Sequence, residues 1–477
     1  MNTVNITRKS DTFRWFMVLG HLCSLIAFMV FARNEYTVLS RFFAWAVFVF
    51  GTFPMLRYVF NRSSGYLPVV ELILLSYVNA FALPVFFQTQ QEHMVKMLYV
   101  EEQPVTLTLL LVFAGMVALY FGYKIAPGLF KTFKVPKMKI NVRNPILVMY
   151  GFLLCILFIF SWATSFGVFQ GLINILVNRD LGVALLALLY YRNCMGIKSR
   201  IFTLFLVACL VLIGVSTSMT QAMLQPIMVW FICRWLVTGK LEIRYVIVGI
   251  IVILLIQPVK IEYRKAFWGM QDQFSALQQA GIFAGLFVNH WFLSTDRELH
   301  ESSSSRSSLL LQTAHVVDWT PDTVPYRNGE TLATIFVAWI PRPLWPDKPV
   351  SQQANIYYAL DYGLSTLEGI KSTMFGVGHL GEIFMNFGGG GIFPVYFLIG
   401  IFSYLLLYLL RIPKNMKALL RDKHGDPNIA ATALFVAGLV QIMFIGSTVT
   451  DAYGGLIQML VVQGSIMFFF SGKRKQK

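Results

Sequence analysis

Three basic residues that directly follow an apolar run have the type and spacing needed to bind phosphate. Lys260, Arg264 and Lys265 follow an apolar run that ends near residue 258. On a continuing helix, Lys260 and Arg264 lie four residues apart and share a face. The planar fork of arginine matches a phosphate bidentately and lysine adds a point charge, so this pair could hold a diphosphate. The competing interpretation is a helix end whose long side chains reach the membrane interface or pair with Glu262.

The segment IPRPLWPDKP, residues 340–349, is a second candidate for phosphate binding. Its four prolines predict an extended, rigid backbone that is neither helix nor central strand. The segment displays two cations, Arg342 and Lys348, together with Trp345, whose aromatic face suits stacking on a sugar ring. A purely structural cap of proline and tryptophan over helix ends is the alternative.

Departure of a diphosphate requires stabilisation of the charge that builds on its oxygens. Fixed arginines in a pocket of low dielectric supply this without a metal. An acceptor hydroxyl that displaces the diphosphate could be deprotonated by a base, for which Glu382, His379 and Asp347 are the candidates. We favour Glu382, although a buried carboxylate could equally pair with an arginine for structural reasons.

The elements that must position these residues are membrane helices. The 477 residues are 56% hydrophobic, 15% aromatic and 13% charged, which does not describe soluble domains. A bilayer crossing needs about 20 mostly apolar residues. Apolar runs occupy residues 15–31, 42–56, 66–87, 104–123, 145–163, 172–191, 201–217, 222–238, 245–258, 391–410, 429–448 and 453–470. We therefore predict an all-α polytopic integral membrane protein with about twelve transmembrane helices.

The formal net charge is +16, and the basic residues are distributed unequally between the two sides of the membrane that these runs define. If the N-terminus is cytoplasmic, about two thirds of the 39 lysines and arginines fall on inward connections, which hold few acids. This asymmetry is what the positive-inside rule requires, and it predicts an N-in and C-in topology. Because the excess charge is explained in this way, nucleic acid is not an expected partner.

The chain divides into helices one to nine (1–258), a large periplasmic loop (259–390) and helices ten to twelve (391–477). The loop contains half of the ten tryptophans and a polar stretch at 298–308, which is a flexible linker or a lid. Near its end, residues 375–387 are apolar apart from His379, Glu382 and Asn386, and glycines follow at 388–391. We predict a re-entrant or surface-lying helix that ends on a glycine hinge, with an ordinary packing helix as the alternative.

Arg179 and Asp180 are the other ionisable residues at membrane depth. The run at 172–191 reaches full length only if both lie within it, roughly 10 Å below its outer end. They form either a buried ion pair within the span, or the end of a re-entrant element at 166–180 that precedes a helix starting at Leu181. In both cases an ionisable residue at this depth is a functional-site candidate.

Other chemistries leave no trace in the sequence. CxxC and HExxH spacings are absent, the seven histidines are scattered, and the five cysteines lie in or beside apolar runs, so we predict neither a metal nor a disulfide-stapled domain. No glycine-rich phosphate loop of the P-loop or Rossmann kind occurs, and no cofactor is expected.

The strings TVPYRNGETLATIFVAWIPRPLWPDKP (323–349) and GEIFMNFGGGG (381–391) resemble the Wzy-type polymerases of bacterial surface polysaccharides, the oligosaccharide repeat-unit polymerases. Many spans, a large periplasmic loop late in the chain and cationic residues on the outer side are also features of that family. In residues the likeness covers about 100 positions.

The resemblance implies a glycosyltransferase of the bacterial inner membrane. It would transfer the growing glycan from undecaprenyl diphosphate to the next lipid-linked repeat unit at the periplasmic face, and its protein partners would be a chain-length regulator and a flippase. Arg264 and Arg342 would contact the donor diphosphate, helped by Lys348, Arg327 and Arg179. The complete candidate site comprises the catalytic residues Arg264, Arg342 and Glu382 and the substrate-binding residues Lys260, Lys265, Arg179, Arg327, Trp345, Lys348 and His379.

Two other functions stay open. An O-antigen ligase shares most of this chemistry and differs in its acceptor. A transporter or flippase of lipid-linked sugars would have internal repeats, broken helices and charges near the bilayer midplane. The sequence shows no convincing repeat, and its polar residues concentrate on one side.

Overall fold

A computed structural model gives the three-dimensional arrangement of the chain. The described residues are 2–60, 67–86, 100–135, 140, 142–163, 173, 176–216, 220–239, 244, 249, 251, 255–256, 258–259, 262–263, 274, 276–293, 309–340, 344–371, 375–410, 412 and 428–471.

Every secondary-structure element of these described residues is a helix, which confirms the predicted all-α class. The α-helices are α1 (Asn2–Phe31), α2 (Val38–Phe60), α3 (Val69–Tyr77), α4 (Glu102–Thr132), α5 (Asn144–Ala163), α7 (Arg179–Tyr191), α8 (Ile197–Ser216), α9 (Thr220–Thr238), α11 (Ala276–Val288), α12 (Leu310–Trp319), α13 (Glu330–Ala333), α14 (Gln353–Asp361), α15 (Gly378–Leu409), α17 (Ile429–Met443) and α18 (Val449–Phe469). Short π or 3-10 helices are η1 (Val78–Ala82), η2 (Leu83–Phe86), η5 (Asn289–Leu293), η7 (Thr334–Phe336) and η8 (Gly369–Lys371).

Seven helices in the described part of the chain are long and apolar enough to cross a membrane, so the chain is a multi-pass membrane protein. They are Val38–Phe60, Val69–Phe86, Glu102–Thr132, Asn144–Trp162, Ile197–Gly214, Gly378–Leu409 and Val449–Phe469. Shorter apolar helices occur at Met17–Phe31 and Ile429–Met443. Two more predicted runs contain α7 and α9, and the run at 245–258 lies largely outside the described residues. The count of about twelve spans therefore stays a prediction.

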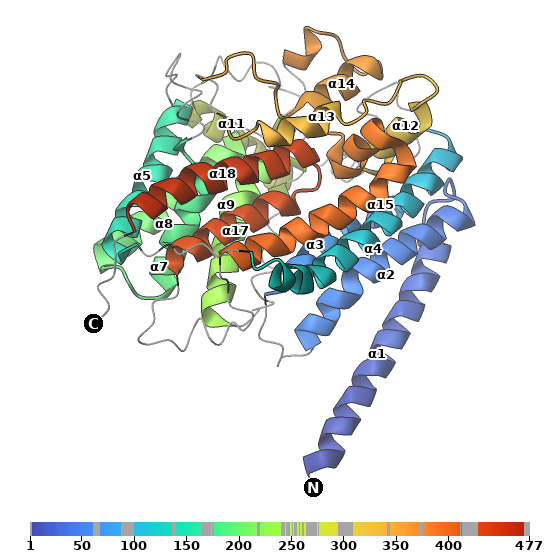
Figure 1. The fold of residues 1–477 in the computed structure, drawn as a ribbon, viewed down its shortest axis with the longest axis horizontal. Coiled ribbons are helices and arrows are strands. Elements are labelled where there is room, and N and C mark those ends of the chain that lie inside the picture. The colour runs from blue at the N-terminus through green and yellow to red at the C-terminus, as the bar shows by residue number, and fades with distance from the viewer. Residues whose placement is uncertain are drawn as a thin grey trace.

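Several connections that are far apart in the sequence meet at one end of the helix bundle (Figure 1). The backbone N–H of Arg33 donates to the carbonyl of Val85 at 2.9 Å, and that of Leu309 donates to Ala80 at 3.2 Å. The N–H of His379, at the start of α15, donates to Ile445 at 3.1 Å, just before α18. We call this end, to which residues 32–37, 78–86, 309–340, 344–371, 375–377 and 444–448 belong, the upper end. The segment between α12 and α15 thus packs onto the bundle instead of forming a separate domain.

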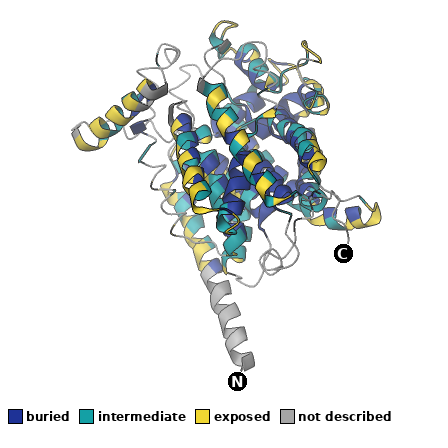
Figure 2. Cartoon of the chain, turned by 90° about the vertical axis from the view of Figure 1, so that its left-hand side faces the viewer, coloured by how far each residue is buried: buried dark blue, intermediate teal, exposed yellow. Residues whose placement is uncertain are grey.

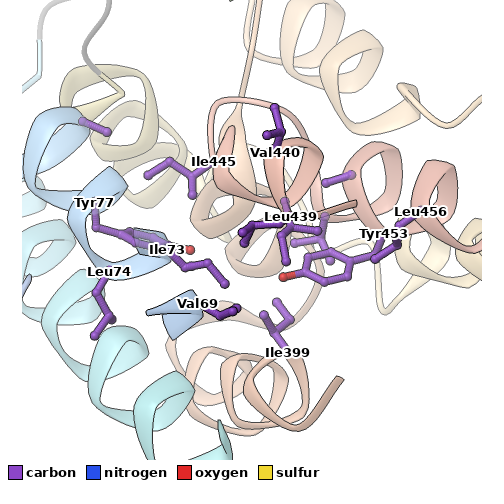
Figure 3. Packing of buried hydrophobic residues seen from close by; sticks show 14 of the residues in the cluster. Val69, Ile73, Leu74, Tyr77, Ile399, Leu439, Val440, Ile445, Tyr453 and Leu456 are labelled. Atoms are coloured by element: carbon purple, nitrogen blue, oxygen red, sulfur yellow. The ribbon is translucent and has the colours of Figure 1, made fainter. Parts of the chain in front are cut away.

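The centre of the bundle is built around α17. Nearly every side chain of this helix from Ile429 to Ile442 is buried, as expected for a helix that is apolar on all sides. Figure 3 shows Leu439 and Val440 of α17 packed among Ile73 of α3, Ile399 of α15 and Leu456 of α18. Figure 2 shows that exposed residues lie on the outside of the bundle. On α3, α15 and α18 they include Leu75, Leu398 and Val461, as expected for helix faces that contact lipid.

Helix α15 carries much of the candidate site and is held closely against α4. A Cβ at Gly400 would lie 2.1 Å from the carbonyl oxygen of Leu119, and one at Gly122 would lie 2.1 Å from that of Phe397. Glycine at both positions therefore lets the two backbones touch, as is common between membrane helices. The position of α15 is fixed by this contact along its lower half.

The predicted glycine break in α15 occurs at Gly388, whose φ of 61° and ψ of −160° are not helical. Residues 378–386 before the break are buried, so this part of α15 packs inside the upper end and does not lie on the surface. After the break the helix continues to Leu409.

Candidate functional site

The turn at residues 326–331 is attached to the first half of α15 through its backbone. Asn328 and Gly329 have φ angles of 49° and 90°, the left-handed region that an Asn-Gly pair adopts readily. This conformation directs the N–H of Asn328 to the carbonyl of Asn386 at 3.1 Å and the N–H of Gly329 to Asn386 Oδ1 at 2.9 Å. The N–H of Arg327 donates to Met385 at 2.9 Å. Three consecutive residues of the turn are therefore fixed to one helix.

A fully buried polar cluster joins this turn to both α15 and α18. Asn386 Nδ2 donates to Thr331 Oγ1 and to the carbonyl of Glu382, each at 2.7 Å. The Glu382 carboxyl accepts from the N–H of Thr450 at 3.0 Å and lies 2.6 Å from its hydroxyl, which also reaches the carbonyl of Thr331 at 3.0 Å. Because Thr450 is in the first turn of α18, its N–H has no acceptor within the helix, and the Glu382 carboxyl supplies one. We define Thr331, Glu382, Asn386 and Thr450 as the anchor cluster.

The break at Gly388 makes room for the turn. A Cβ at this position would lie 2.6 Å from the hydroxyl oxygen of Tyr326, closer than atoms can approach without movement. The φ of 61° is also unfavourable for any other residue. Glycine at 388 is thus required both by its own backbone and by the tyrosine that lies over it.

Arg327 is the described cation of this turn, and it already has carboxylate partners. Its guanidinium pairs with Asp361 of α14, lies 3.9 Å from Glu330 and covers the ring of Tyr357 with 4.0 Å to the centroid. The hydroxyl of Tyr357 donates to Glu330 at 2.5 Å; this hydrogen bond, with burial, raises the pKa of Tyr357. A guanidinium next to two carboxylates has little net charge left to attract a phosphate, so Arg327 would have to exchange a partner to bind one.

Lys348 closes the proline-rich segment. Its Nζ donates to the carbonyls of Ala338 at 2.9 Å and Ile340 at 2.8 Å, and so holds the two ends of the loop at 340–348 together. Trp345 is exposed on this loop, with 39% of its surface accessible. Asp347, the third candidate base, is exposed as well. Arg342 belongs to the same loop but lies outside the described residues.

His379 lies inside the bundle, one helical turn before Glu382. Its side chain is 2% exposed, and its Nδ1 is 3.5 Å from the hydroxyl of Tyr77 of α3, which in turn donates to Tyr396 at 3.2 Å. Its Nε2 has no hydrogen-bond partner among the described residues. A substrate could reach this ring only after the surrounding helices moved.

Arg179 joins α7 to α9 and does not contact the anchor cluster. It begins α7, where Asn178 caps the helix by accepting from Leu181 N at 2.8 Å. The guanidinium donates to the carbonyl of Ala222 at 3.1 Å and to Gln225 Oε1 at 2.6 Å, and lies 3.3 Å from Asp180. The predicted ion pair of Arg179 and Asp180 is therefore present, and a short helix begins at Arg179.

The structure brings together some of the predicted site residues and leaves others unplaced. Glu382, His379 and Arg327 lie on or against the first half of α15, and Lys348 and Trp345 lie on the loop that follows η7. Lys260, Arg264 and Lys265, like Arg342, lie outside the described residues. Residues that the sequence did not single out complete the described site, namely Thr331, Thr450, Tyr357 and Asp361. A signal was available only for the turn itself, in the Asn-Gly pair.

Metal ligands do not gather in the described part of the chain, where no group of three or more His, Cys, Asp or Glu side chains could hold an ion. All five cysteines are free thiols. No protein-family model, curated protein or solved structure matches this chain.

Proposed function

We propose that this chain is a glycosyltransferase of the Wzy type, which polymerises lipid-linked oligosaccharide repeat units. The reaction joins the glycan on one undecaprenyl diphosphate to the next lipid-linked unit, with the diphosphate as leaving group. The resemblance of 323–349 and 381–391 to that family motivates the reaction class.

One observation carries the proposal: the turn at 326–331, which belongs to the family-like strings, is hydrogen-bonded to α15 and α18 at the upper end of the bundle. The turn at 326–331 is fixed to α15 and α18, and the following loop is closed by Lys348. A rigid loop at this height can meet a substrate whose tail is in the bilayer and whose diphosphate is at its surface.

The proposed division of roles rests on Arg264 and Arg342 as the diphosphate clamp, with Lys260 and Lys265 nearby. Lys348 orders the loop of Arg342 through backbone carbonyls, and Trp345 offers a ring for a sugar. Glu382 remains the proposed base, although its contacts with Thr450 also suit a structural role.

The topology proposed with this function has about twelve spans with both termini in the cytoplasm, in a bacterial inner membrane. The upper end is then periplasmic. The donor and acceptor enter from the bilayer after a flippase has delivered them. A chain-length regulator is the other proposed protein partner.

The test is polymerisation by the purified full-length protein in proteoliposomes supplied with lipid-linked repeat units. Arg264→Lys and Arg342→Lys should each abolish the ladder of products, because lysine keeps the charge and loses the bidentate fork. Arg57→Lys is the matched control on an exposed helix position near the opposite end, and it should retain activity. Full activity in both clamp variants would disprove the clamp.

The same assay separates the alternatives. A ligase would leave the repeat units single until a lipid A core acceptor is added, and would then transfer glycan to it. A transporter would move labelled units across the membrane without forming a glycosidic bond.

A further inference from the structure

Four large apolar side chains between residues 336 and 345, outside the candidate spans, are exposed. Phe336 and Leu344 are each 79% exposed, and Trp339 and Trp345 are 43% and 39% exposed. Between Glu330 and Asp347 the sequence contains a single charged residue, Arg342. Large exposed apolar side chains in a cluster mark a surface that contacts a protein or a membrane.

The position of this segment along the membrane-spanning helix α18 distinguishes a protein partner from a membrane. A Cβ at Gly454 would lie 2.9 Å from the Cβ of Ala338, so Ala338 packs beside the second turn of α18. Helix α18 has 21 residues, about 31 Å of helix, which matches a hydrocarbon core about 30 Å thick. Gly454 is about 8 Å along that helix from its first residue. The segment therefore lies beside the beginning of a span and not above it.

Two contacts with the first turn of α18 hold the segment at this height. On one side of it, the Thr450 hydroxyl reaches the carbonyl of Thr331 at 3.0 Å. On the other side, the hydroxyl of Ser351 donates to Asp451 at 3.0 Å. The exposed rings between these contacts are thus kept at the level where α18 enters the bilayer (Figure 1 shows α13 close to α18).

The polar groups of the segment are arranged as the membrane interface requires. The indole N–H of Trp339 donates to the carbonyl of Phe336 at 2.9 Å, and Lys348 Nζ occupies two further carbonyls. Backbone groups that would be costly in an apolar medium are therefore partly satisfied from within. Tryptophan side chains are enriched at this boundary because one part of the ring system is apolar and the other donates a hydrogen bond.

We infer that Phe336, Trp339 and Leu344 form a membrane anchor and insert into the interface of the adjacent phospholipid leaflet. The partner is the bilayer itself, not a second protein. This inference does not depend on the proposed reaction.

Site-specific photocrosslinking in phospholipid vesicles tests the anchor. p-Benzoyl-phenylalanine replaces Leu344 or Phe336 in the full chain, and the protein is reconstituted with radiolabelled phosphatidylcholine and irradiated. Asp322, exposed on the same upper end but polar, is the control position. We expect severalfold more lipid adduct from positions 344 and 336 than from 322.

Two results would overturn the inference. Lipid adducts at 344 and 336 no more abundant than at 322 would show that the segment is in water. A crosslinked dimer in place of a lipid adduct would show that a second copy of the chain covers the surface. Elution of each variant as wild type in gel filtration verifies that it is folded. Failure of the anchor would leave the polymerisation assay unaffected, so the two proposals can fail separately.

Discussion

Substitution of Glu382 by glutamine and by leucine separates a structural carboxyl from a catalytic one. The carboxyl accepts from the Thr450 N–H and lies 2.6 Å from the Thr450 hydroxyl. A glutamine can reproduce this pattern: its oxygen accepts from the N–H, and its amide donates to the hydroxyl oxygen. The hydroxyl hydrogen is then free to bond the carbonyl of Thr331. Leucine can make neither bond.

The expected magnitudes follow from these contacts. Leucine leaves the buried N–H of Thr450 without an acceptor, which costs about 1–3 kcal/mol, and removes a hydrogen bond with a net value of about 1 kcal/mol. We expect Glu382→Leu to lower stability by about 2–4 kcal/mol. Glutamine loses only the interaction of a carboxylate with the N-terminus of α18, so Glu382→Gln should cost about 1 kcal/mol or less.

Thermal unfolding in detergent, followed with a thiol-reactive fluorophore, measures the difference. Cys155 and Cys233 are buried and become reactive when the helices separate. A Glu382→Leu protein that melts with wild type would refute the anchor cluster as a source of stability. The polymerisation assay then adds the catalytic question: a stable Glu382→Gln protein that forms product excludes Glu382 as the base, and a stable but inactive one supports that role.

Three further outcomes are expected. Burial among three aromatic rings lowers the pKa of His315 from 6.5 to about 4 in the folded protein. The free energy of unfolding should therefore fall by up to about 3 kcal/mol as the pH drops from about 6.5 to 4, because the unfolded chain binds the proton first. Melting curves of His315→Phe at several pH values should show a weaker pH dependence. Gly388→Ala, which meets Tyr326, should lower the melting temperature, while Gly390→Ala, which meets nothing within 4 Å, should not. Lys348→Met keeps the aliphatic stem and loses two carbonyl contacts, so we expect reduced polymerisation with a nearly unchanged melt.

The sequence predicted the helices well because a membrane leaves a chain few alternatives. Every backbone N–H and C=O in hydrocarbon needs a partner, and a helix supplies all of them locally. Helix boundaries were less predictable. The run at 172–191 contains a helix that starts only at Arg179, because Asn178 caps it there. The glycine run at 388–391 predicted a hinge, and a single residue, Gly388, provides the break before the helix resumes.

The candidate site could be predicted only for residues that stand out from their neighbours in the sequence. Glu382 and His379 are conspicuous because polar residues interrupt an apolar run. The partner of Glu382 is Thr450, 68 positions away, and threonine within an apolar helix gives no signal. For Arg327, the resemblance implied contact with the diphosphate, and nothing in the sequence indicated its ion pair with Asp361, 34 positions away. Charge is a property of the sequence, whereas neutralisation depends on tertiary contacts.

Attachment at both ends explains how a segment with little regular structure can present side chains at fixed positions. The described part of residues 331–351 contains only short helices, and the sequence has four prolines there, so on its own this segment would gain little from folding. Thr331 and Ser351 attach the two ends to the first turn of α18, and the Nζ of Lys348 donates to the carbonyls of Ala338 and Ile340 between them. The N-cap of α18 links the helix to this loop: the Thr448 hydroxyl accepts from the N–H of Asp451 at 3.0 Å and donates to the carbonyl of Ser351 at 3.3 Å. The attachment of the loop at Ser351 and the capping of α18 therefore stabilise each other.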